Sequence, residues 1–152
     1  MSLEIEYRFS VVEKFINQAT AKGLEEAQAS RLCQLGSIMV CGNLERCVEL
    51  TISRRLEKQS PKQVASFLKA FFRRGSNYDC DAICQLVHKF DNVWGKRLEV
   101  ALTESMRDSI SSCYSVRNSV AHGGTNSLGP KSLRQYFDAS FEVIVALEAA
   151  LT

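Results

Sequence analysis

The sequence predicts an all-α fold, a single domain over residues 1–152 with about five to six helices, one of them long and central. Three observations lead to this prediction. The chain has only two prolines, it lacks segments in which apolar and polar residues alternate, and its apolar residues recur at helical spacing. A chain of 152 residues with 45% hydrophobic and 24% charged residues is long enough to bury a core and has an ordinary globular composition.

Helical patterns follow one another along the chain, separated by glycines and polar residues. The first runs from about Leu3 to Ala19, and Gly23 separates it from a much longer helix that ends near Lys58. Ser60 and Pro61 form an N-cap and first-turn pair for a third helix, which Gly75–Asn77 ends. This helix carries the apolar residues Val64, Phe67, Leu68, Phe71 and Phe72, and its three phenylalanines are expected in the core.

The second half of the chain continues in the same way. A fourth helix is predicted from about Asp79 to Phe90, after which Trp94–Gly95 leads into a helix that contains no Pro or Gly from Thr103 to His122. A loop follows, and Pro130 opens a last helix with a clear amphipathic stripe. That stripe consists of Leu133, Tyr136, Phe137, Phe141, Ile144, Leu147 and Leu151.

Charge, hydropathy and cysteine usage limit the classes of protein to which the chain could belong. The formal net charge is only +2, no apolar run reaches membrane-spanning length, and Met1–Glu4 does not resemble a signal peptide. The six cysteines (33, 41, 47, 80, 84 and 113) lie within helical apolar patterns, which is typical of buried, reduced thiols. We therefore expect a cytoplasmic protein that does not insert into a membrane.

The stretch Ser115–Gly124 stands out because it combines chemistry-bearing residues with an abrupt helix end. Arg117 lies on the apolar arc of its helix, where a guanidinium needs an anion because it cannot lose its proton. Asn118 and His122 are one turn apart on the neighbouring polar flank, and Gly123–Gly124 ends the helix. A cation, an amide and an imidazole at a helix end suggest a functional site.

The long second helix is apolar almost all round, so it should be surrounded by its own domain or by a partner chain. Glu45 lies on one of its apolar arcs, and a carboxylate there also requires a partner. We favour a buried ion pair between Glu45 and Arg117. The alternative is that Glu45 reaches solvent past small neighbours.

Arg117-Asn118-x-x-x-His122, followed by Gly late in an all-helical chain, resembles the RxxxxH motif of HEPN domains. The chain length, the long helix carrying Gly42–Glu45 and the final amphipathic helix match the layout of that family, most closely that of HEPN proteins linked to RNA cleavage (RiboL-PSP-HEPN-like). The resemblance implies a helical bundle and a metal-independent, cofactor-free endoribonuclease that works as a homodimer. Many relatives belong to toxin or antiviral defence systems, so an antitoxin or a neighbouring defence protein is a possible partner.

The resemblance also implies roles for the site residues. His122 would be the acid/base residue, Arg117 would stabilise the phosphate and orient the site, Asn118 would position the scissile phosphate, and Glu45 would orient Arg117. Two alternatives stay open. Arg117 and Glu45 could form only a buried strut, with His122 a mere helix-terminal cation. The chain could also be a non-catalytic HEPN module that dimerises, or binds nucleotide or RNA, beside another enzyme.

Basic residues cluster where the second and third helices meet: Arg54, Arg55, Lys58, Lys62, Lys69, Arg73 and Arg74. Such a cluster could bind an RNA backbone or could simply be a solvated face. Because Phe67, Phe71 and Phe72 are expected in the core, the sequence argues against a base-stacking platform here.

Cys80, Cys84 and His88 recur every four residues on one helical face, a spacing that could mimic a metal site. Three ligands at this spacing extend over two turns, and no second pair completes a four-coordinate zinc site. Core thiols and a hydrogen-bonded histidine are the better interpretation, so we predict no metal site.

Overall fold

The computed structural model describes residues 1–57, 62–72, 77–124 and 127–152, with the backbone alone for residues 62, 63, 65 and 69. These residues form seven α-helices and no β-strand, so the all-α prediction is confirmed. The helices are α1 (Leu3–Ala19), α2 (Glu26–Glu57), α3 (Lys62–Phe72), α4 (Cys80–Phe90), α5 (Asn92–Ala101), α6 (Glu104–Ala121) and α7 (Pro130–Ala150).

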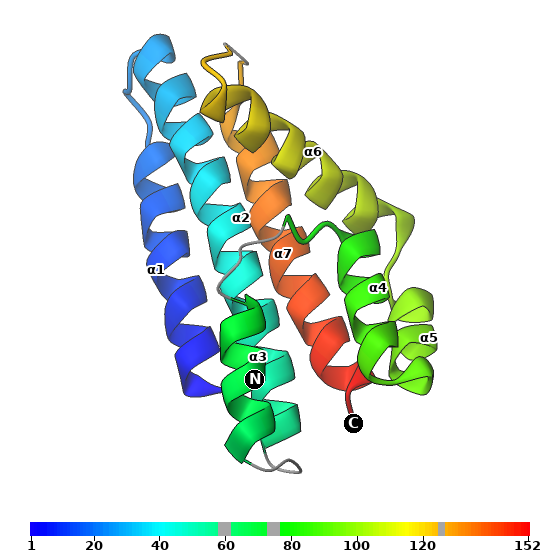
Figure 1. Cartoon of the computed structure of the whole chain (residues 1–152). Helices are drawn as coiled ribbons and strands as arrows, with labels where there is room; N and C mark the ends of the chain where they lie inside the picture. Colours follow the sequence, from blue (N-terminus) through cyan, green and yellow to red (C-terminus); the bar gives the residue numbers. More distant parts are fainter. Residues whose placement is uncertain (58–61, 73–76, 125–126) are drawn as a thin grey trace.

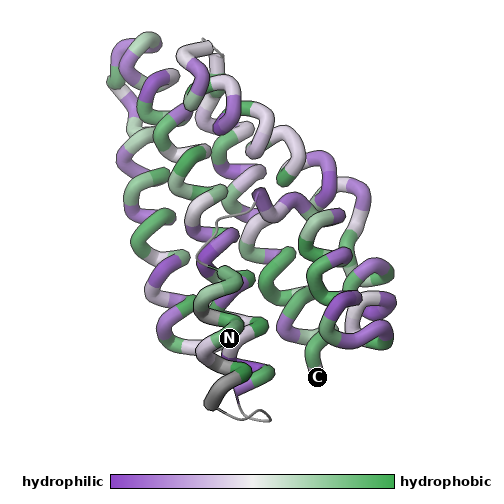
Figure 2. The backbone as a smooth tube through the Cα atoms, viewed as in Figure 1, coloured by the Kyte–Doolittle hydropathy of each residue, from purple (hydrophilic) through white to green (hydrophobic). Residues whose placement is uncertain are grey.

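The long helix α2 is the centre of the bundle (Figure 1). It packs against α1, α3, α6 and α7, while α4 and α5 form a short hairpin against α6 and α7. The buried residues of α2 recur along most of its length, from Cys33 to Ile52. Figure 2 shows hydrophobic residues along α1, α2, α4 and α7. The all-round apolar pattern of α2 is explained largely by these four neighbours.

Side-chain caps start several helices where the sequence allows them. Ser2, Asp79 and Thr103 each accept a hydrogen bond from the backbone N–H three residues on, at the start of α1, α4 and α6. The predicted cap Ser60–Pro61 lies outside the described residues, as do Gly75 and Ser76. No helix of the described chain combines the length and apolarity that a membrane span requires.

The separate helix α5 was not predicted. Asp91 ends α4 and caps α5, because its carboxylate accepts from the N–H groups of Val93 and Trp94 at 2.7 and 3.0 Å. The hairpin is tight because Gly95 lies against the His88 ring, where an added Cβ would come within 2.3 Å of the imidazole. Trp94–Gly95 is therefore part of a helix of its own, and the expected count of five to six helices was too low.

The predicted core position of the aromatic residues in α3 is wrong for two of the three. Phe72 is buried, but Phe67 is 67% exposed and Phe71 is 38% exposed. The physical reason is that α3 lies on the outside of the bundle against α2, which covers Leu68 and Phe72 but leaves the rest of the apolar stripe open. Phe141 in α7 is also partly exposed, and its ring makes an edge-to-face contact with Phe9.

Candidate active site

The candidate site lies at the C-terminal end of α6. This end is closed by a Schellman motif: Gly124 N–H donates to the carbonyl of Ser119 at 2.8 Å, and Gly123 N–H donates to that of Val120 at 3.1 Å. Gly123 has φ +75°, a left-handed conformation that glycine adopts without strain. The motif ends the helix at His122, which is its C-cap residue.

Arg117 is half-buried and is held by two amide oxygens. Its Nη1 donates to Asn118 Oδ1 on the same helix and to Asn77 Oδ1 in the segment before α4, both at 3.0 Å. Both acceptors are neutral, so the guanidinium keeps its positive charge available for an anion. The structure thus brings together Arg117 and Asn118 as the sequence suggested, and adds Asn77.

Glu45 is linked to this site through Tyr114 rather than directly. The Tyr114 hydroxyl donates to Glu45 Oε1 at 3.3 Å and accepts from the backbone N–H of Tyr78 at 3.1 Å. The predicted direct ion pair with Arg117 is not found among the contacts of these described residues, because the guanidinium turns toward the two asparagines instead. Arg117 still acts on Glu45 through its charge.

The ionisation of Glu45 and Tyr114 reflects this arrangement. Burial raises the pKa of Glu45 above its usual range, while the charge of Arg117 and the hydrogen bond from Tyr114 lower it by less. Burial and the neighbouring Glu45 carboxylate raise the pKa of Tyr114 well above its usual range. Tyr114 is therefore a neutral donor at physiological pH, and it ties α6 to α2 and to the segment that carries Asn77.

The side chain of His122 is exposed, whereas those of Arg117 and Asn118 are partly buried. Its imidazole has no hydrogen bond or ion pair to the part of the chain that the structure describes. Its backbone N–H donates to the carbonyls of Asn118 and Ser119, so the helix end holds the backbone while the ring remains accessible. An accessible imidazole near a fixed guanidinium can exchange a proton with a bound phosphodiester.

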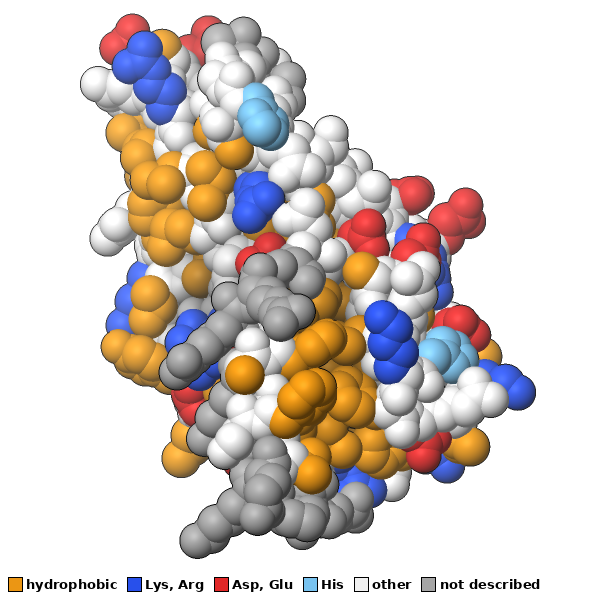
Figure 3. All heavy atoms as spheres, in the orientation of Figure 1, with side chains coloured by type: hydrophobic (Ala, Val, Ile, Leu, Met, Phe, Trp, Pro, Cys, Tyr) orange, Lys and Arg blue, Asp and Glu red, His pale blue; other side chains and the backbone are white. Residues whose placement is uncertain are grey.

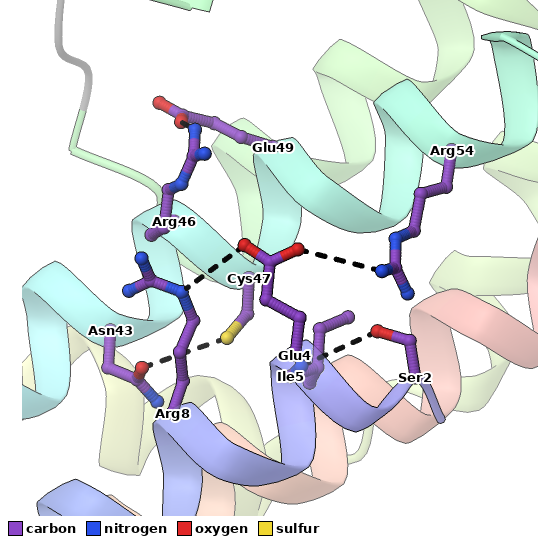
Figure 4. Close-up of polar contacts among 9 residues, drawn as sticks. All are labelled: Ser2, Glu4, Ile5, Arg8, Asn43, Arg46, Cys47, Glu49 and Arg54. Carbon is purple, nitrogen blue, oxygen red and sulfur yellow. Dashed lines mark hydrogen bonds and ion pairs between the residues drawn. The ribbon is translucent and has the colours of Figure 1, made fainter.

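The structure describes two of the six predicted RNA-binding residues in full, and both have protein partners. Arg54 Nη2 lies 3.5 Å from Glu4 Oε2, and Figure 4 shows this carboxylate between Arg54 and Arg8. Arg55 donates to the carbonyl of Leu151 at 2.5 Å, and its guanidinium lies 5.1 Å from the centre of the Trp94 ring. Arg55 thus joins α2 to the end of the chain and to α5. The other four lie outside the described side chains: Lys58, Lys62, Arg73 and Arg74.

Cys80, Cys84 and His88, whose spacing resembles that of metal ligands, have structural roles. His88 is hydrogen-bonded through both ring nitrogens, to Asn92 Oδ1 and Glu99 Oε1, each at 2.9 Å. Cys80 and Cys84 are buried, and burial raises the pKa of the Cys80 thiol to about 12. In the described chain no group of three or more His, Cys, Asp or Glu side chains is arranged to hold a metal ion. All six cysteines are buried free thiols, as the sequence predicted.

A family model for RiboL-PSP-HEPN matches residues 3–152, which is nearly the entire chain.

The chain belongs to the RiboL-PSP-HEPN family.

The predicted resemblance to HEPN domains is therefore confirmed. Arg117 and His122, which the sequence suggested as the RxxxxH motif, lie in the last turns of α6 and at its C-cap. No curated protein and no solved structure matches the chain.

Sequence reasoning missed Asn77 and Tyr114. Tyr114 lies one turn before Asn118 on α6, a spacing that could have suggested a shared site. Asn77 had no such signal, because it lies outside any helix and its neighbours in sequence do not indicate which element it meets.

Proposed function

We propose that this RiboL-PSP-HEPN domain is a metal-independent endoribonuclease that cleaves single-stranded RNA. The observation that carries the proposal is that one helix end carries both a guanidinium held by two neutral amide oxygens and an exposed imidazole that has no partner among the described residues. Arg117 is suited to stabilise a negatively charged phosphorane, and His122 is suited to transfer protons at neutral pH. Neither role requires a metal ion or a cofactor.

In the proposed reaction the 2′-oxygen of RNA attacks the adjacent phosphorus. A bond forms from the 2′-oxygen to phosphorus while the bond from phosphorus to the 5′-oxygen breaks. One imidazole takes the proton of the 2′-hydroxyl, and a second acid gives a proton to the departing 5′-oxygen. Arg117 stabilises the charge that develops on the phosphorane, and Asn118 positions the phosphate. The products are a 2′,3′-cyclic phosphate and a 5′-hydroxyl.

One histidine does not readily serve both sides of the scissile bond, so we propose that a second copy of the chain supplies the other. An exposed apolar surface on α1 and α2 supports this proposal: Tyr7, Val11 and Leu35 are exposed, and Tyr7 and Val11 line one pocket with Met39 of α2. Figure 3 shows hydrophobic side chains gathered over α1 and α2, and α2 packs beside α6, which carries the RxxxxH motif. A two-fold dimer through this surface would bring two copies of α6 near one axis.

The activity is tested with the protein and a mixed RNA pool in excess EDTA. We expect cleavage by the parent, with 2′,3′-cyclic phosphate ends, and none of the equivalent DNA, which lacks the attacking hydroxyl. His122→Ala should abolish cleavage without unfolding the protein, since its side chain has no described partner. His88→Ala is the matched control and should retain the activity of the folded fraction, because His88 lies in the α4–α5 hairpin.

Activity that requires Mg²⁺, survives the loss of His122 or leaves 5′-phosphates would contradict the mechanism. The non-catalytic HEPN module, a binding partner of another enzyme, would then be the better account. An inactive parent protein that still binds RNA would lead to the same conclusion.

The variant Leu35→Glu tests whether a second copy of the chain binds through this surface and is needed for cleavage. Leu35 is 47% exposed on α2, so a carboxylate there keeps the monomer folded but opposes burial at an interface. Light scattering should show a dimer for the parent and a monomer for Leu35→Glu, which should also lose cleavage. Val100→Glu is the control, since Val100 is 88% exposed on α5, outside this surface. A dimer that survives Leu35→Glu would place the interface elsewhere.

A further inference from the structure

The exposed aromatic pair on α3 is the feature that the proposed reaction leaves unused. Phe67 and Phe71 are one turn apart, and their rings lie nearly parallel, with centroids 6.4 Å apart and 29° between the ring planes. Phe67 is among the most exposed large hydrophobic residues of the described chain. Figure 3 shows hydrophobic side chains on the surface in the region of α3. Burial of these rings would be favourable, so the pair is a candidate contact surface.

The positive charge of residues 58–74, which include α3, indicates which kind of partner this surface binds. Residues 58–74 contain five basic residues and no Asp or Glu. A second copy of the same segment would carry the same positive charge and would be repelled. Single-stranded nucleic acid instead combines a negative backbone with flat bases, and proteins that bind it pair basic segments with aromatic side chains on which bases stack.

The position of α3 relative to the candidate site agrees with this partner. Phe72, the last residue of α3, precedes Asn77 by five residues, and Asn77 accepts a hydrogen bond from Arg117. Five residues extend over at most about 18 Å, so the C-terminal end of α3 lies within that reach of the segment holding Arg117. A strand a few nucleotides long could therefore contact both.

We propose that Phe67 and Phe71 form a stacking platform for an unpaired base of the RNA substrate, one to a few nucleotides from the scissile phosphate. The inference rests on the proposed ribonuclease function and adds a binding site to it. It also revises the expectation from sequence, which argued against a platform because both rings were assigned to the core.

Binding is tested with a fluorescently labelled, single-stranded 2′-O-methyl RNA, which cannot undergo attack by the 2′-oxygen. The double variant Phe67→Leu/Phe71→Leu keeps the surface apolar but removes the rings, and it should bind about tenfold or more weakly by fluorescence anisotropy, as expected for the loss of base stacking. Val64→Leu is the matched control on the same helix and should bind like the parent; Val64 is exposed but carries no ring.

A second variant reports stacking directly. Phe67→Trp should retain affinity, and its added emission should be quenched when RNA binds, whereas Val100→Trp on α5 should show no quenching. The signal of Trp94, the single native tryptophan, is subtracted with the parent protein. Both variants replace exposed residues, so the fold should tolerate them.

The outcomes separate this inference from the proposed function. Parent-like binding of the leucine variant, unchanged Phe67→Trp emission, or no binding of the RNA by the parent would overturn the platform, even if the parent cleaves RNA. A change of oligomeric state in the leucine variant would assign the surface to a second copy and also overturn it. Weaker binding with quenching would support the platform even if the His122→Ala test refuted the cleavage mechanism.

Discussion

Tyr114→Phe removes one oxygen atom from the candidate site and should loosen the segment that positions Arg117. In the parent the Tyr114 hydroxyl accepts from the N–H of Tyr78 and donates to Glu45. Phenylalanine fills the same space, so no cavity forms. The Tyr78 N–H loses the hydroxyl to which it donates. Because Tyr78 is buried, water has little access to replace this acceptor.

The size of the effect follows from these partners. Removing the hydroxyl that accepts from a buried N–H costs about 1–3 kcal/mol. Glu45 also loses a donor, but it is only half-buried, and water can replace that bond at little cost. We therefore expect the free energy of unfolding to fall by about 1–3 kcal/mol, which lowers Tm by about 2 to 12 °C in a chain of this size. Because Asn77 adjoins Tyr78, RNA cleavage should also slow.

Urea and thermal unfolding, followed by circular dichroism, measure the loss. Tyr136→Phe is the matched control, since the Tyr136 hydroxyl makes no hydrogen bond to the described residues and its removal should change stability by less than about 0.5 kcal/mol. Amide hydrogen exchange at Tyr78 should accelerate only in Tyr114→Phe. If both variants unfold alike and Tyr78 exchanges as in the parent, the hydrogen bond does not hold this segment.

Two further substitutions test the electrostatics and the packing. Burial raises the pKa of Glu45 above 4.5, so its stabilising contribution is complete below about pH 4.5 and is lost as the pH rises through the raised pKa. Glu45→Gln should therefore gain stability relative to the parent as the pH rises from about 4 to about 7 in chemical denaturation; a widening deficit would mean that the charge of Arg117 outweighs burial. Gly95→Ala should destabilise the protein by about 1–3 kcal/mol, because its methyl group would overlap the His88 ring, which two hydrogen bonds hold in place. Gly42→Ala is the control within a helix: an added Cβ meets no atom within 4 Å, and thermal unfolding should show no loss. Equal losses in the two variants would refute the packing argument.

Features that depend on local chemistry were predictable from the sequence. The limits of α1, α2 and α7 follow from apolar spacing, from Gly23 between α1 and α2, and from Pro130 in the first turn of α7, all of which act within a few positions along the chain. Arg117, Asn118 and His122 could be grouped for the same reason, since one helix carries all three and Gly123 ends it. The family could be suggested from this motif, and the match over residues 3–152 confirmed it.

What only the tertiary structure decided is which elements meet. Periodicity assigns Phe67 and Phe71 to one face of α3, but whether a neighbour covers that face depends on where α3 packs, and α2 covers Leu68 and Phe72 instead. The pairing of Glu45 with Arg117 was a reasonable inference from opposite charges. In the folded chain Tyr114 bonds to the carboxylate, and two asparagines bond to the guanidinium. Which side chains become partners depends on distances between residues far apart in the chain, and a single sequence does not specify those distances directly.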